Sequence, residues 1–113
     1  MRFLMMHRLP ESAAEAWNPS PEFVERMGGM IQDWVGRGIL ITAEGVHTSE
    51  RGARVRKTED GVTSADGPFG GEVIGGFALI NAKDRAEAVA LAEQYAAMFD
   101  RVEVEIREIH EFE

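Results

Sequence analysis

The stretch Asp66-Gly67-Pro68-Phe69, followed closely by Gly75-Gly76-Phe77, is the centre around which this chain is organised. A helix and a strand-rich segment precede it, and a second strand–helix–strand run follows it. Glycine and proline next to an aspartate are typical of a turn, so we expect a loop over Asp66–Gly71. A glycine pair inside a strand indicates a bulge or a close approach of another backbone segment.

The length and composition indicate one domain, residues 1–113, with a single core. The net charge of −8 disfavours binding to nucleic acid or to anionic membranes. The apolar run Phe3–Met6 is too short for a signal peptide or a membrane span. The chain has no cysteine, which excludes thiol chemistry and fits a reducing compartment. We therefore expect a soluble cytoplasmic protein.

Four segments rich in apolar and β-branched residues predict the strands of one sheet: Arg2–His7, Ile39–Val46, Val73–Asn81 and Arg101–Ile109. In the second segment, simple alternation places Leu40 and Ala43 on opposite faces. Two further runs flank Asp60-Gly61, which predicts a β-hairpin of Ala53–Thr58 and Val62–Ala65.

Two helices are predicted from their capping residues. Ser20-Pro21-Glu22 begins the first helix, and Gly38 ends it; its apolar face contains Phe23, Met27, Met30, Ile31 and Trp34. Gly28-Gly29 interrupts this helix at a cost of about 1 kcal/mol per glycine, which close packing on the sheet would explain. Asp84 and Glu87 begin the second helix, and its apolar stripe contains Val89, Ala92, Tyr95, Ala96 and Phe99. The segment from Glu11 to Pro19 is predicted to be a loop.

This order of elements predicts an α+β fold of the ferredoxin-like kind, with an antiparallel sheet, two helices on one face and an extra β-hairpin. The other face must be solvated or covered by a partner. Two sets of side chains could form this partner-covered face: Phe3 and Met5 with their neighbours, or the residues on the opposite face of the same strands. We predict that a second copy covers this face in a symmetric homodimer.

The chain resembles the DGPF family, within the wider YciI-like group, over roughly residues 1–109. The resemblance rests on the apolar first strand, Glu44-Gly45, Val62-Thr63, Asp66-Gly67-Pro68-Phe69, Gly75-Gly76-Phe77 and Val104-Glu105-Ile106-Arg107. It implies a subunit that pairs into a dimeric α/β barrel, in a family whose activities are mostly uncharacterised. The YciI branch has a histidine early in its first helix, where this chain has Phe23, and an Asp-Pro pair that is missing near Phe99-Asp100. The His–Asp pair of that branch therefore does not carry over.

Asp66 and His47 are the candidate catalytic residues. Asp66 is either a base at the mouth of a cleft or a turn residue that accepts backbone amides, and the structural interpretation is favoured. His47 is the best single acid/base candidate, because Glu44 and Asp66 are expected near the same rim of the sheet.

Glu44, Glu105 and Arg107 are the candidate ligand-binding residues. Glu105 and Arg107 share one face of the last strand, where they either line a barrel or form a solvated face. The histidines at 7, 47 and 110 lack metal-ligand spacing, and no nucleotide-binding glycine motif is present, so we predict no metal and no cofactor. Two functions remain open: an enzyme-like homodimer that binds a small organic molecule near the Asp-Gly-Pro-Phe loop, or a non-catalytic module in which that loop is structural.

Overall fold

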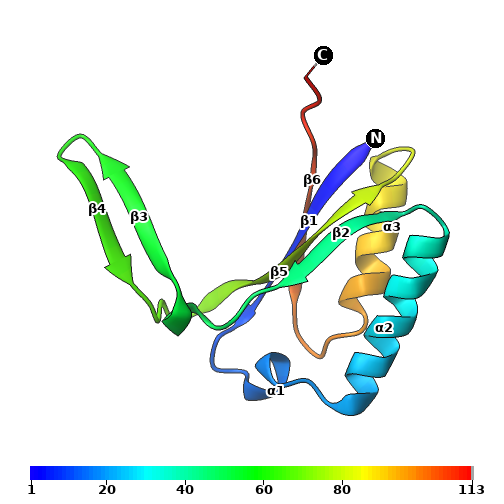
Figure 1. The fold of residues 1–113 in the computed structure, drawn as a ribbon, viewed down its shortest axis with the longest axis horizontal. Coiled ribbons are helices and arrows are strands. Elements are labelled where there is room, and N and C mark those ends of the chain that lie inside the picture. The colour runs from blue at the N-terminus through cyan, green and yellow to red at the C-terminus, as the bar shows by residue number, and fades with distance from the viewer. Residues whose placement is uncertain (113) are drawn as a thin grey trace.

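The computed structural model of the protein describes residues 1–112, apart from the side chain of Glu15. The elements in chain order (Figure 1) are β1 (Arg2–Pro10), α1 (Ala14–Trp17), α2 (Pro21–Gly36), β2 (Leu40–Gly45), the single 3₁₀ turn η1 (Ser49–Arg51), β3 (Ala53–Thr58), β4 (Gly61–Asp66), β5 (Glu72–Asn81), α3 (Arg85–Ala96) and β6 (Glu103–Glu108). The predicted α+β class and the predicted hairpin are confirmed.

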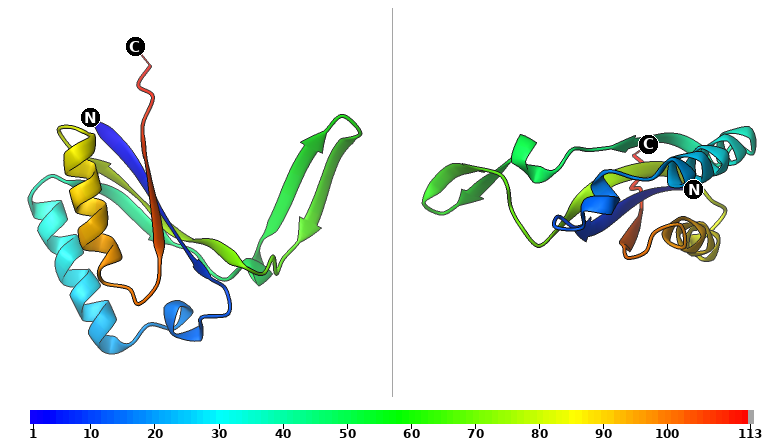
Figure 2. Two further views of the ribbon diagram at one scale, coloured as in Figure 1. Left: turned by 180° about the vertical axis from the view of Figure 1, so that it is seen from behind. Right: turned by 90° about the horizontal axis from the view of Figure 1, so that it is seen from below.

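The four main strands form one antiparallel sheet in the order β2-β5-β1-β6. This order, with the two longer helices α2 and α3 as crossovers, is the ferredoxin-like arrangement. Strands β3 and β4 pair only with each other in a separate two-stranded sheet. Figure 1 shows α2 and α3 on one side of the main sheet and the β3–β4 hairpin projecting on the other side. The views of Figure 2 show that the hairpin stands clear of the sheet and helices.

The core lies between the main sheet and the two helices. Its buried side chains come from β1, α2, β5 and α3 and from the turns beside them: Phe3, Met5, Trp34, Ile39, Ala78, Ile80, Ala82, Ala88, Leu91 and Ala92. Because Phe3 and Met5 face the helices, the alternate residues of β1, Leu4 and Met6, face the opposite side. This opposite side is called the open face below.

The capping residues predicted for both long helices are confirmed. The Ser20 hydroxyl accepts a hydrogen bond from the Phe23 amide at 3.1 Å, at the start of α2. The Asp84 carboxylate accepts from the Glu87 amide at 2.9 Å, at the start of α3. Gly38 has φ of 71°, a left-handed conformation that favours glycine after a helix.

Three local expectations are wrong. A bulge between Leu40 and Thr42 puts Leu40 and Ala43 on the same face of β2, because the extra residue shifts the alternation by one. The predicted loop over Glu11–Pro19 contains the short helix α1. On α3, the predicted Ala92 is buried, but Val89 is exposed and Ala88 and Leu91 are buried in its place.

Close packing does not explain the glycine pair in α2. A Cβ atom added to Gly28 or to Gly29 would meet no atom within 4 Å. The helix therefore carries the conformational cost of both glycines without a steric reason in this chain.

Candidate functional site

His7 lies on β1 at a bulge that two glycines make possible. The register shifts between His7 and Arg8, so that Gly75 of β5 is the extra residue opposite them. A Cβ at Gly75 would lie 2.6 Å from His7 Nε2, and one at Gly76 would lie 2.8 Å from His7 Cε1. Only glycine leaves space for the imidazole here. The bulge and close approach predicted for the glycine pair are therefore confirmed.

Tyr95, near the end of α3, holds the other side of the histidine ring. Its hydroxyl oxygen is 2.7 Å from His7 Nδ1. Phe99 follows α3 and packs on both rings, with centroid distances of 5.3 Å to His7 and 5.1 Å to Tyr95. Phe23 of α2 packs edge-on against Phe99 at 5.1 Å. The hydrogen-bonded pair thus lies in an aromatic surrounding, a geometry that favours stable packing.

The surroundings keep both members of this pair neutral near pH 7. Burial lowers the pKa of His7 below its ordinary value of 6.5, because desolvation disfavours the imidazolium. Burial also raises the pKa of Tyr95 to about 12. A neutral imidazole has one donor and one acceptor nitrogen, and among the described residues Nε2 has no hydrogen-bond partner.

Two adjoining cavities lie beside this pair, between the sheet and α2. The inner cavity has a volume of about 280 Å³. Its lining is mainly apolar and aromatic and includes His7, Phe23, Met27, Trp34, Tyr95 and Phe99. The outer cavity, of about 560 Å³, shares Ala16, Phe23 and Phe99 with the inner one. The two cavities therefore adjoin, and the aromatic pair Phe23–Phe99 lines both.

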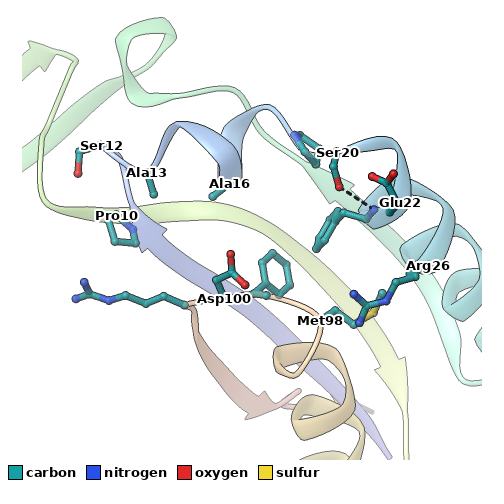
Figure 3. Close-up of a pocket in the computed structure, with 13 residues that line it drawn as sticks. Pro10, Ser12, Ala13, Ala16, Ser20, Glu22, Arg26, Met98 and Asp100 are labelled. Carbon is teal, nitrogen blue, oxygen red and sulfur yellow. Dashed lines mark hydrogen bonds between the residues drawn. The ribbon is translucent and has the colours of Figure 1, made fainter.

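The mouth of the outer cavity carries charged side chains. In Figure 3, Glu22 and Arg26 extend from α2 on one side, and Met98 and Asp100 come from the segment after α3 on the other. Arg101 also lines this cavity. The combined site therefore has a polar entrance and an apolar, aromatic interior, which is the usual composition of a small-molecule site.

The Asp-Gly-Pro-Phe loop is fastened elsewhere, at the root of the hairpin. The Glu11 carboxylate accepts hydrogen bonds from the Ser49 amide at 2.6 Å, the Ser49 hydroxyl at 2.5 Å and the Gly70 amide at 3.2 Å. The Ser49 hydroxyl in turn accepts from the Phe69 amide at 2.8 Å. These bonds lower the pKa of Glu11, with the Ser49 hydroxyl as the largest cause. One carboxylate thus joins three distant segments.

Steric fit adds to this fastening. A methyl group at Gly67 would overlap the carbonyl oxygen of Ser49, and the Gly67 amide donates to the Gly52 carbonyl at 2.9 Å. The Arg54 guanidinium lies 3.9 Å from the centroid of the Phe69 ring, within the range of a cation–π contact. The loop thus joins the hairpin to the main sheet through hydrogen bonds with the residues around it.

A family model described as YCII-related domain matches residues 1–113. The chain belongs to this family. The YciI-like expectation from the sequence is therefore confirmed. A search of curated proteins found no match. Among residues 1–112, the structure has no helix that is both long and apolar enough to cross a membrane.

This YCII-related domain does not bring its predicted site residues together in the cavities. Asp66 is the last residue of β4, not the first of the loop, and its side chain is exposed. His47 is also exposed, in the segment after β2. Of the predicted residues, only Glu44 borders the inner cavity, although its register opposite Phe77 places its side chain on the open face. The catalytic roles of Asp66 and His47 stay predictions.

Glu105 and Arg107 lie side by side on the open face. Their register opposite Met6 and Leu4 places them there, and Arg107 donates to Glu105 at 3.2 Å. In the single chain the Arg107 side chain is 72% exposed, so the pair is in contact with solvent. A ligand-binding role for this pair therefore depends on what covers the open face.

His7 and Tyr95 are the site residues that sequence reasoning missed. The sequence presents His7 only as one of three possible metal ligands, and among the described residues no group of three such side chains could hold a metal. The spacing of Tyr95 predicts only a place in the apolar stripe of its helix. The glycine pair Gly75-Gly76 is the feature of the sequence that points to this site. Two glycines in a strand leave space for a side chain from the neighbouring strand, and here β1 supplies His7.

Proposed function

We propose that this YCII-related domain binds a small aromatic acid in the paired cavities, with its ring in the inner cavity and its carboxylate toward the outer one. The observation that carries the proposal is the neutral His7–Tyr95 pair, joined by a 2.7 Å hydrogen bond at an aromatic-lined cavity. A half-buried titratable pair of this kind beside a cavity is typical of functional sites.

The pair offers a polar contact in either tautomer of the histidine. If the Tyr95 hydroxyl donates to Nδ1, Nε2 carries the proton and acts as a donor. If Nδ1 carries the proton, Nε2 is an acceptor and the Tyr95 hydroxyl has its own proton to donate. The first tautomer offers a bound molecule a hydrogen-bond donor, and the second offers Nε2 as an acceptor that can take a proton, as a general base does.

The cavity lining favours a flat, mainly apolar ring. Phe23, Tyr95 and Phe99 surround the inner space with aromatic faces and edges, and such rings stack favourably with a ligand ring. Arg26 at the outer cavity supplies a cation that can pair with a carboxylate. Phe23 occupies the place where the YciI branch has a histidine, so the chemistry here would depend on His7 instead.

Two earlier hypotheses remain as alternatives. A cleft at Asp66 and His47 would make Asp66 the acid/base group, and the exposure of both side chains gives it little support. The non-catalytic module, with a structural Asp-Gly-Pro-Phe loop, is favoured by the Glu11–Ser49 network. A structural loop is also compatible with a ligand in the paired cavities.

A homodimer formed through the open faces is part of the proposal. Leu4, Met6, Phe77 and Leu79 give this face an apolar centre, and α2 and α3 cover only the other side of the sheet. A sheet with one apolar face uncovered is expected to bury it against a partner. The pairing would also enclose Glu105 and Arg107, as the resemblance to dimeric α/β barrels implies.

Binding of benzoate and phenol, measured by calorimetric titration, tests the ligand proposal. We expect benzoate to bind the wild type, with Tyr95→Phe weakening both ligands and Arg26→Gln weakening benzoate alone. Thermal melts should show the matching stabilisation, about 2.7 kcal/mol at a ligand concentration of 100 Kd. Asp66→Asn is the control and should bind as the wild type does.

Three results would contradict this proposal. Equal affinity of the wild type and Tyr95→Phe would place the ligand outside the cavity. Loss of binding in Asp66→Asn alone would favour the Asp-Gly-Pro-Phe cleft. Absence of binding by benzoate, phenol and related small acids would favour the non-catalytic module.

A further inference from the structure

The single chain exposes more surface than its mass requires. A compact monomer of 12.5 kDa exposes about 6,200 Å², whereas this chain exposes 7951 Å². The excess is roughly 1,800 Å², and a standard interface buries about 800 Å² on each partner. The radius of gyration is 15.8 Å, against about 13 Å for a compact domain of this length. The excess surface is therefore sufficient for a stable interface.

Much of this excess comes from the β3–β4 hairpin, called the arm below (Ala53–Asp66). Apart from Gly61, every residue of its two strands is exposed. An isolated two-stranded hairpin is at best marginally stable in water. The Glu11–Ser49 network holds only the root of the arm. The rest of the arm has no covering element in the described part of the chain (Figures 1 and 2).

The two faces of the arm differ in chemistry. The register pairs Val55 with Ser64 and Lys57 with Val62, so Val55 and Val62 are diagonal neighbours on one face. They are 72% and 65% exposed, respectively. Arg54 and Arg56 lie on the opposite face. We call the face with Val55 and Val62 the valine face.

We propose that the valine face of each arm packs on the body of a second copy of this chain, so that two arms embrace reciprocally in the homodimer. This inference rests on the homodimer part of the proposed function. The arm projects on the side of the open face, away from the helices (Figure 1). A second copy that covers the open face therefore lies on the same side as the arm, and a two-fold axis gives both arms the same contact.

Charge favours a second copy over an unrelated partner. On β3, Lys57 pairs with Val62 and so shares the valine face, whereas Arg54 and Arg56 lie on the opposite face. On β6, at the edge of the main sheet, Glu103 and Glu105 lie on the open face, opposite Arg8 and Met6. The valine face thus offers a lysine to the carboxylates of the open face, and such complementarity orients association.

Sedimentation equilibrium over a range of protein concentrations tests this interface. The variant Val55→Asp/Val62→Asp places two charges on the valine face and should raise the dimer Kd at least tenfold. Its matched control is Val24→Asp/Val35→Asp on α2, where the valines are 56% and 58% exposed, and its Kd should stay within twofold of the wild type. Met6→Asp probes the open face and should also weaken the dimer.

A milder variant is the control for the case in which the aspartates unfold the hairpin itself. Threonine keeps the β-branched shape, so Val55→Thr/Val62→Thr should retain the hairpin and weaken the dimer by a smaller factor than the aspartates. Amide hydrogen exchange of β3 and β4 gives a second readout, because protection should rise with protein concentration only if a second copy covers the arm.

The outcomes separate the two proposals. Weakening by the arm variants but not by the α2 control supports the embrace. Weakening by Met6→Asp alone, with concentration-independent exchange in the arm, overturns the embrace and leaves the homodimer intact. A wild type that stays monomeric at all concentrations overturns both. The ligand cavities lie within one chain, so benzoate binding is tested separately from each of these results.

Discussion

The hydrogen bond between Tyr95 and His7 should contribute measurably to stability. Tyr95→Phe removes one oxygen atom and keeps the ring, so the contacts with Phe99 at a centroid distance of 5.1 Å are retained. The loss leaves His7 Nδ1 without its partner in a half-buried, aromatic surrounding. A buried polar group that loses its partner costs about 1–3 kcal/mol. Because this pair is not fully buried, we expect about 1–2 kcal/mol.

A double-mutant cycle isolates this contribution. His7→Phe leaves the Tyr95 hydroxyl unpaired and should also destabilise the protein, whereas replacement of both partners leaves no unpaired group. The double variant should therefore be more stable than the sum of the single effects predicts, with a coupling energy of about 1–2 kcal/mol. The phenyl ring of His7→Phe is larger than imidazole and can add strain. Strain that is the same with and without the Tyr95→Phe change cancels in the coupling energy.

Urea unfolding gives the four free energies needed for the cycle. Fluorescence of Trp34, which is buried in the core, reports the transition. Thermal melts should show a fall of about 4 °C per kcal/mol for a domain of this size. A coupling energy within error of zero would refute the argument that the pair is joined in the native protein, and with it the structural basis of the proposed site.

Two further predictions concern glycines and pH. Gly67→Ala should destabilise the fold by more than about 3 kcal/mol, because its methyl group overlaps the Ser49 carbonyl. The matched Gly28→Ala should stabilise it by about 0.5–1 kcal/mol, and the same unfolding assay compares them. For pH, the unfolded chain binds a proton to histidine near pH 6.5 and folded His7 does so only at lower pH. Stability should therefore be constant above this value and fall as the pH decreases below it. His7→Gln should remove this dependence and His47→Gln should keep it; an unchanged profile in His7→Gln would contradict the assignment.

The individual helices, strands and turns, and their order along the chain, follow from the local sequence. Ser20 and Asp84 mark helix starts because a cap needs only a side chain and an amide three residues away. Asp60-Gly61 likewise predicts the hairpin, because the type of turn depends on the residues within it. From the order of strands and helices, the ferredoxin-like topology follows with few alternatives.

Contacts between side chains that are distant in the chain depend on the three-dimensional fold. His7 and Tyr95 are 88 positions apart, and Glu11 and Ser49 are 38 positions apart. Such contacts depend on strand register, and a single extra residue changes the register for every residue after it. The bulges at Gly75 and after Leu40 are shifts of this kind.

Dependence on long-range packing also explains why the predicted site residues do not meet in the cavities. The sequence predicts Asp66, His47 and Glu44 near one rim of the sheet, yet of these only Glu44 borders a cavity. The orientation of the arm and the identity of the open face likewise depend on packing between distant segments. Local sequence thus determined what the elements are, and long-range packing determined where their side chains point.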